Sequence, residues 1–168
     1  GRAGEGKTTF TKGLIEILRK NDTDAGGIIS ERVMSDHQTT GYDVTDIQTG
    51  EKVVFLRQNE LVGSEKIGRF SIHPEGLAMG NRILSSLALS DTKIVIIDEV
   101  GLLELNNKGW SGSIDKLLER SGNHILMTIR NSFIDAVKQK WDLKEAVVFD
   151  ISKTGNTEAS KSILSAIS

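Results

Sequence analysis

Apolar residues recur along the chain with two different spacings, and segments of the two kinds alternate. Spacings of three and four residues are typical of helices with one buried face and predict helices at 8–20, 74–89, 108–120, 132–141 and near the C-terminus. Short apolar or alternating runs predict strands at 26–33, 42–47, 52–56, 66–72, 93–98, 124–129 and 146–151. Because apolar strands between helices are typical of sheets covered on both faces, we expect an α/β fold with a mainly parallel sheet and helices on both faces.

Local turn signals refine this pattern. Thr49 and Gly50 separate the predicted strands 42–47 and 52–56, and therefore predict an antiparallel hairpin that extends the sheet. Ser132 is the expected N-cap of the helix that follows it. No linker, repeat or low-complexity tract divides the chain, and 168 residues suit one domain with a real core. We expect a single domain over residues 1–168.

Composition and charge then narrow the possible partners. The chain has 21 Lys and Arg against 23 Asp and Glu, for a net charge of −2, so its overall charge attracts neither nucleic acid nor an anionic membrane. No apolar run approaches the roughly 20 residues that a membrane-spanning helix needs. Cysteine is absent, which excludes a disulfide framework and thiolate metal sites and fits a cytoplasmic protein.

The phosphate-binding P-loop pattern, also called Walker A, occupies the first nine residues, Gly1-Arg2-Ala3-Gly4-Glu5-Gly6-Lys7-Thr8-Thr9. Glycines let successive backbone N–H groups point at phosphate oxygens, and the following helix adds the positive end of its dipole. The pattern assigns Lys7 to the β- and γ-phosphates and the Thr8 hydroxyl to Mg²⁺. A glycine-rich turn that caps a helix is the alternative interpretation.

A P-loop connects a buried strand to a helix, and the sequence as given begins on the first residue of the loop. We therefore expect an apolar strand of about five or six residues before Gly1. It should lie in the sheet close to the strand at 94–97, so that Lys7, Thr8 and the acidic end of that strand converge. A chain that begins at Gly1 is expected to fold poorly without it.

A second chemical motif, of the Walker B type, ends the predicted strand 93–98. The apolar residues Ile94 to Ile97 precede Asp98 and Glu99. This pattern describes a buried strand that delivers carboxylates to the end of the sheet where ligands bind. We expect Asp98 to hold Mg²⁺ and Glu99 to position the water that attacks the γ-phosphate. The alternatives are an Asp98 that caps a turn and a Glu99 that is merely solvated.

Further charged residues lie near predicted strand ends. Arg130 follows the strand 124–129 and is the candidate catalytic arginine, with a solvated or salt-bridged role as the alternative. Glu104 either orients the site or fixes the loop after the Walker B strand. Glu31 and Arg32 are candidates for an ion pair, either beside the γ-phosphate or purely structural.

These motifs also resemble a known family. The stretch Asp98-Glu99-Val100-Gly101-Leu102-Leu103-Glu104-Leu105 looks like the signature of thermostable nucleoside-triphosphatases, whose animal members are called cancer-related nucleoside-triphosphatases. The resemblance covers most of the chain, and continues at 26–33, 41–44 and 67–70. It implies a RecA-like P-loop fold and Mg²⁺-dependent hydrolysis of nucleoside triphosphates with a loose choice of base. It also supports Lys7 and Thr8 on phosphate and metal, Asp98 on Mg²⁺ and Glu99 as the water-positioning base.

Two segments depart from the family pattern. Many members carry Thr-x-x-Asn-Arg after the last strand, whereas here Asn156 is displaced by one place and the arginine is missing. If that segment touches the base or ribose, nucleotide preference or affinity differs in this chain. Where members often have Gly-Thr or Ala-Thr followed by a His or Pro segment, this chain has Met127-Thr128-Ile129-Arg130-Asn131.

Three function classes follow from these residues. The leading one is a Mg²⁺-dependent hydrolase that converts ATP, GTP and other nucleoside triphosphates to the diphosphate and phosphate. We expect slow turnover, because a single domain without a supplied arginine finger often hydrolyses slowly. The second class is a phosphotransferase that acts on a nucleotide or small molecule and needs an acceptor pocket. The third is a nucleotide-dependent switch or partner-binding protein.

Overall fold

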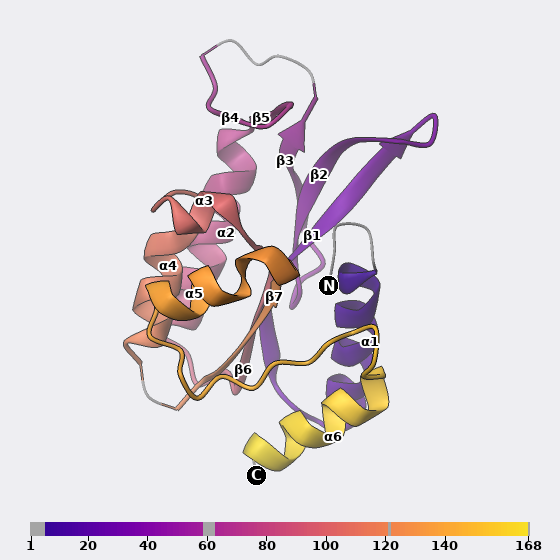
Figure 1. The fold of residues 1–168 in the computed structure, drawn as a ribbon, viewed down its shortest axis with the longest axis vertical. Helices are drawn as coiled ribbons and strands as arrows, with labels where there is room; N and C mark the ends of the chain where they lie inside the picture. The colour runs from indigo at the N-terminus through magenta and orange to yellow at the C-terminus, as the bar shows by residue number, and fades with distance from the viewer. Residues whose placement is uncertain (1–5, 59–62, 121, 168) are drawn as a thin grey trace.

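The computed structural model describes residues 6–58, 63–120 and 122–167 and shows one mixed β-sheet between two layers of helices (Figure 1). The strands are β1 (Ala25–Ser35), β2 (Gln38–Asp46), β3 (Lys52–Arg57), β4 (Lys66–Ile67), β5 (Phe70–Ile72), β6 (Ile94–Val100) and β7 (His124–Ile129). The helices are α1 (Lys7–Lys20), α2 (Pro74–Leu87), α3 (Leu102–Leu105), α4 (Ser111–Leu118), α5 (Ile134–Lys140) and α6 (Asn156–Ile167), with a 3₁₀ turn over Asn131–Phe133. The expected α/β class is confirmed.

The sheet has a parallel part and an antiparallel extension, in the order β4-β5-β3-β2-β1-β6-β7. β1, β6 and β7 are parallel, and β2, β3, β5 and β4 continue the sheet through antiparallel pairs. The expected hairpin at Thr49 and Gly50 joins β2 to β3 and is confirmed.

Strands β1 and β6 approach each other closely at Gly27. A Cβ on Gly27, whose φ is 124°, would overlap the carbonyl oxygen of Ile96. This position therefore requires glycine.

The two faces of the sheet carry separate apolar cores. Helices α2 and α4 cover one face, where Trp110 packs, and α1 and α6 cover the other (Figure 1). Strand β6 lies between them: Val95 and Ile97 belong to the first core, and Ile94 and Ile96 belong to the second. Burial on both faces explains why its apolar run is continuous rather than alternating. None of the described helices is long and apolar enough to cross a membrane.

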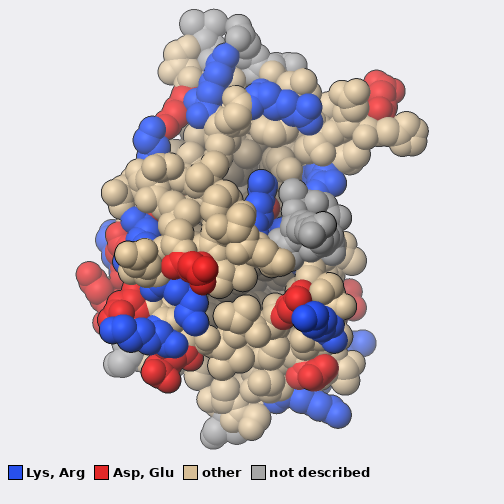
Figure 2. Space-filling view, viewed as in Figure 1, with Lys and Arg blue, Asp and Glu red and all other residues tan. Residues whose placement is uncertain are grey.

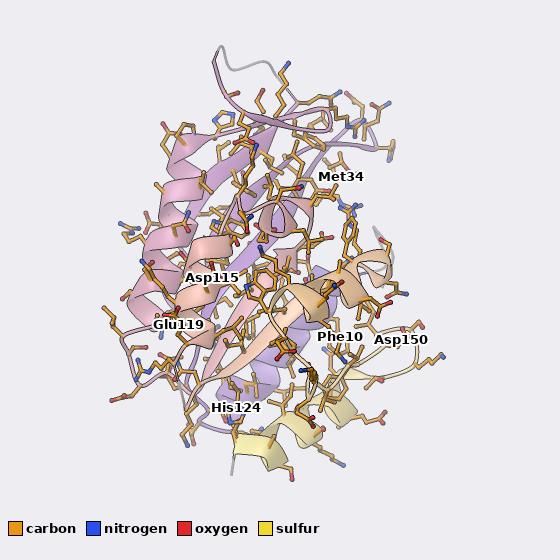
Figure 3. The ribbon with its side chains drawn as sticks, turned by 60° about the vertical axis from the view of Figure 1, so that its left-hand side comes forward. Phe10, Met34, Asp115, Glu119, His124 and Asp150 are labelled. Carbon is orange, nitrogen blue, oxygen red and sulfur yellow. The ribbon has the colours of Figure 1, made fainter. Side chains whose placement is uncertain are left out.

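The strand expected at 146–151 is wrong. This segment is a loop, and the side chain of Val147 is 73% exposed. A strand needs a hydrogen-bonding neighbour, and this segment does not pair with β7, the edge strand of the described sheet, whose partner is β6. A groove of about 410 Å³ with mostly apolar lining lies between β7 and this segment, and Figure 3 labels two of its lining residues, Phe10 and Asp150.

Three smaller expectations also change. The predicted strand 66–72 is a hairpin of two short strands, because Gly68 takes a positive φ of 56° and reverses the chain. The helix expected at 108–120 begins only at Ser111, and the short helix α3 precedes it. Ser132 does not cap α5: it lies within the 3₁₀ turn, and Phe133 occupies the N-cap position without a side-chain hydrogen bond.

Candidate active site

The described end of the P-loop borders a pocket of about 320 Å³ at the carboxyl ends of the parallel strands, which we call the phosphate pocket. Gly6 has a left-handed backbone with a φ of 84°, and helix α1 begins at Lys7. The N-terminus of α1 borders the pocket together with Thr8 and Thr9, which is the arrangement that favours bound phosphate. Five predicted loop residues lie outside the described residues: Gly1, Arg2, Ala3, Gly4 and Glu5.

Beside this pocket lies a buried carboxylate that is held by two hydroxyl groups. Asp98, in β6, is only 1% exposed. The Thr8 hydroxyl donates to its Oδ2 over 2.8 Å, and the Thr128 hydroxyl on β7 donates to its Oδ1. Burial raises the pKa of Asp98, although both hydrogen bonds act in the opposite direction. We call Thr8, Asp98 and Thr128 the floor cluster.

The chemistry of the floor cluster fits a divalent cation. Within the part of the chain that the structure describes, no Lys or Arg forms an ion pair with Asp98. Nor do those residues include a group of three or more His, Cys, Asp or Glu that could hold a metal by themselves. Mg²⁺ typically takes one or two carboxylates and completes its shell with water and substrate phosphates. One buried carboxylate beside a hydroxyl is such a partial ligand set.

Opposite charges line the phosphate pocket next to the floor cluster. Arg130, directly after β7, donates from Nε to Oε1 of Glu99 over 2.6 Å, and Nζ of Lys7 lies 3.9 Å from the same oxygen. Glu99 and Arg130 are partly exposed. We call Lys7, Glu99 and Arg130 the charged wall. The face drawn in Figure 2 is hollowed near its centre, with a Lys or Arg side chain in the hollow.

Thr128 is a site residue that the sequence alone does not single out. Its signals are its place in the strand after the Walker B strand and the threonine that family members often have there. Its contact with Asp98 depends on β7 lying beside β6, with Met127 opposite Ile97. That register brings the Thr128 hydroxyl to Asp98. Strand adjacency is a property of the fold, which no local motif states.

Glu104 has a structural role. Its buried carboxylate accepts the backbone N–H of Gly101 over 2.9 Å and that of Trp110 over 3.3 Å. Burial raises its pKa, and these backbone hydrogen bonds act in the opposite direction. Of the two roles open in the sequence, the geometry favours fixing the loop after β6.

Glu31 also has partners other than the expected one. Its carboxylate lies 2.8 Å from Nζ of Lys12 and 3.2 Å from Nζ of Lys52, and it accepts a hydrogen bond from Thr45. Arg32 also lines the phosphate pocket, but no ion pair joins it to Glu31 among the described residues. Glu31 therefore ties α1 to β1 and β3 at the border of the phosphate pocket.

Asn156, in the segment that departs from the family pattern, contacts a helix. It begins α6, and its side-chain amide donates to the carbonyl oxygen of Phe10 in α1 over 3.1 Å. A Cβ on Gly13 would overlap that amide, so the two helices approach closely there. The displaced asparagine thus joins α6 to α1.

Fold and site together define a P-loop protein with a nucleotide-binding pocket, and comparisons with known proteins agree. Residues 1–164 match the family model described as NTPase, so the chain belongs to this NTPase family. The expected class of enzyme, a nucleoside-triphosphatase, is thereby confirmed, as is the family resemblance of the sequence motifs.

Individual relatives support the same assignment. The nucleoside-triphosphatase THEP1 of Archaeoglobus fulgidus is 30% identical over 145 residues, which are 84% of this chain and 82% of the relative. The THEP1 of Methanocaldococcus jannaschii is 26% identical over 143 residues, 85% of this chain and 82% of the relative.

Two solved structures share the fold. The solution structure of a human cancer-related nucleoside triphosphatase has a TM-score of 0.75, at 21% identity, and the match covers 99% of this chain and 94% of that chain. The crystal structure of THEP1 from Aquifex aeolicus has a TM-score of 0.74, at 21% identity, with 99% and 95% covered.

Proposed function

We propose that the protein hydrolyses nucleoside triphosphates to the diphosphate and phosphate in a Mg²⁺-dependent reaction, slowly and with a loose choice of base. The observation that carries the proposal is the convergence of the floor cluster and the charged wall beside the N-terminus of α1. The pocket offers positive charge to phosphate, a carboxylate to a metal and a second carboxylate to water.

Each residue has a separate task in this reaction. Backbone N–H groups at the start of α1 and the Lys7 ammonium bind the β- and γ-phosphates and neutralise their charge. Thr8 and Asp98 hold Mg²⁺, which supplies further positive charge to the phosphate oxygens when it is bound. Glu99 orients a water molecule toward the γ-phosphorus and accepts its proton as the bond to the leaving diphosphate breaks.

Arg130 explains the expected slow turnover. Its guanidinium donates to the Glu99 carboxylate over 2.6 Å. We propose that the guanidinium moves from Glu99 to the γ-phosphate when nucleotide binds, and that this exchange frees the carboxylate to bind water. We infer that the two events are coupled and that their cost slows the reaction.

Product analysis tests the proposal directly. The purified protein is incubated with ATP, GTP, CTP or UTP, with Mg²⁺ or with excess EDTA, and without any added acceptor. We expect diphosphate and inorganic phosphate from all four nucleotides in Mg²⁺, and neither product in EDTA. Undiminished hydrolysis in EDTA, or release of pyrophosphate, would contradict the assignment.

A further inference from the structure

A second pocket, of about 310 Å³, adjoins the phosphate pocket. Five aromatic side chains line it, from β2, β3, β5, the start of α4 and the turn before α5: Tyr42, Phe55, Phe70, Trp110 and Phe133. We call it the aromatic pocket. Two of its rings, Phe55 and Trp110, are stacked with their centroids 4.8 Å apart.

The two pockets meet at the charged wall. Glu99 and Arg130 line both of them, as do Ser30 and Tyr42. Of these two pockets, Lys7 and Thr8, which bind phosphate and metal in our proposal, line the phosphate pocket and not the aromatic one. A molecule in the aromatic pocket would therefore lie next to the Glu99 carboxylate, where hydrolysis requires the attacking water.

The aromatic pocket is larger than the space that one attacking water molecule requires. One water molecule occupies about 30 Å³, so this pocket is roughly ten times larger than the attacking water. Binding sites for small organic molecules begin at about 300 Å³ and are mostly apolar with a few placed polar groups. The aromatic pocket meets both criteria.

Charged groups lie at two places in the aromatic pocket. Glu99 and Arg130 lie next to the phosphate pocket, whereas the Arg69 guanidinium lies over the Phe70 ring and donates to the carbonyl oxygen of Thr39. The Glu104 carboxylate is occupied by the N–H groups of Gly101 and Trp110. The indole N–H of Trp110 lies against Gly80 of α2, because a Cβ there would overlap it. The lining thus favours a flat apolar body in the pocket with one polar group at Glu99.

We propose that the aromatic pocket binds a small aromatic alcohol, which replaces water as the acceptor of the γ-phosphoryl group. The alcohol oxygen attacks the γ-phosphorus, the bond between that phosphorus and the bridging oxygen breaks, and the nucleoside diphosphate leaves. The hydroxyl proton moves to Glu99, and the second product is a phosphate monoester. This inference rests on the role of Glu99 in the proposed function and adds a second substrate class to the same site.

Competition between two alcohols tests the inference. The protein turns over ATP and Mg²⁺ in the presence of 2-phenylethanol or of ethanol at equal concentration, and the ratio of phosphate monoester to inorganic phosphate is measured by ³¹P NMR. Both alcohols offer the same primary hydroxyl, and only one carries a ring. Because a bound acceptor gains effective concentration, we expect a ratio at least about tenfold higher for 2-phenylethanol.

A matched pair of variants locates the effect. Leu102 lines the aromatic pocket and is 51% exposed, so Leu102→Trp narrows the pocket and should lower the 2-phenylethanol ratio to the ethanol value. Leu89→Trp makes the same change at an exposed residue outside the pocket and should leave the ratio unchanged. Equal ratios for both alcohols, or an unchanged ratio in Leu102→Trp, overturn the inference. Hydrolysis without alcohol, and its dependence on Glu99, is measured separately and reports on the proposed function alone.

Discussion

The floor cluster and the charged wall lie side by side at the same pocket, yet their surroundings differ. Asp98 is buried, and hydroxyl groups from α1 and β7 hold it from two sides. Glu99 is the next residue, but it faces two open pockets and is held by the side chain of Arg130. A fixed carboxylate suits a metal that must stay in place, whereas a partly exposed one can exchange partners. The comparison predicts that substitutions in the charged wall lower the rate of hydrolysis, whereas substitutions in the floor cluster weaken the binding of Mg²⁺.

Lys7→Ala is expected to have the largest effect. The side chain is 8% exposed in the phosphate pocket, so its loss leaves phosphate charge without its main neutralising group. We expect kcat/KM for ATP to fall by about 10³-fold. Lys12→Ala is the control, because Lys12 lines the same pocket but is bound to Glu31 at 2.8 Å. Comparable losses in both variants would show that only overall charge matters.

Glu99→Gln and Asp98→Asn distinguish the role of the charged wall from that of the floor cluster. The amide keeps the shape of the side chain but accepts no proton, so we expect kcat to fall by about 10²-fold while nucleotide affinity is retained. Asp98→Asn should instead raise the Mg²⁺ concentration needed for half-maximal activity. If Glu99→Gln turns over as fast as the original protein at saturating ATP, Glu99 has no part in the chemistry.

The elements of the site that the sequence predicts are those encoded in contiguous motifs. The P-loop residues and the strand that ends in Asp98 and Glu99 carry their geometry locally, and Arg130 follows a strand recognisable by its apolar run. The aromatic pocket could not be predicted, because its side chains come from five separate parts of the chain and meet only through packing.

The apolar run at 146–151 shows why strand prediction fails at the edge of this sheet. Such a run is compatible with a paired strand and with a loop that lines an apolar groove, and only a hydrogen-bonding partner decides between them. The strand expected before Gly1 stays a prediction. In the described sheet β1 and β7 flank β6 on its two sides, so a further strand cannot pair with β6 itself. Among the parallel strands, only the outer edge of β7 is left for such a strand.

Thr128→Val tests the floor. The substitution keeps the side-chain shape and removes the hydroxyl that donates to Asp98. Partners that orient a metal ligand typically change metal affinity by 10- to 100-fold, and we expect about tenfold weaker Mg²⁺ activation with kcat nearly unchanged at saturating metal. Thr49→Val is the matched control, since its hydroxyl donates to Asp46 in a surface turn over 2.9 Å. A reduced kcat with normal Mg²⁺ dependence in Thr128→Val would contradict the assignment of the floor cluster to metal binding and of the charged wall to the rate.

Glu31 gives the smallest expected effect and a pH dependence with a defined sign. Burial alone would raise its pKa, but hydrogen bonds from Lys12, Thr45 and Lys52 outweigh burial and lower the pKa from 4.5 to about 2. A carboxyl whose pKa is lowered on folding contributes stability above the unfolded-state value, and loses that contribution as the pH falls toward the folded-state value.

Glu31→Gln should therefore lower Tm at pH 7 by about 1 to 4 °C, as expected for partly exposed ion pairs in a chain of this size. Most of the Tm difference between the two proteins should be gone at pH 3, because the stabilisation by the Glu31 charge is lost as the pH falls from about 4.5 to about 2. Thermal unfolding followed by circular dichroism at both pH values measures this Tm difference. Glu51→Gln is the control, since its contact with Arg82 at 3.5 Å is exposed. A Tm difference for Glu31→Gln that is equally large at pH 7 and pH 3 would mean that the charge of Glu31 does not join α1 to the strands.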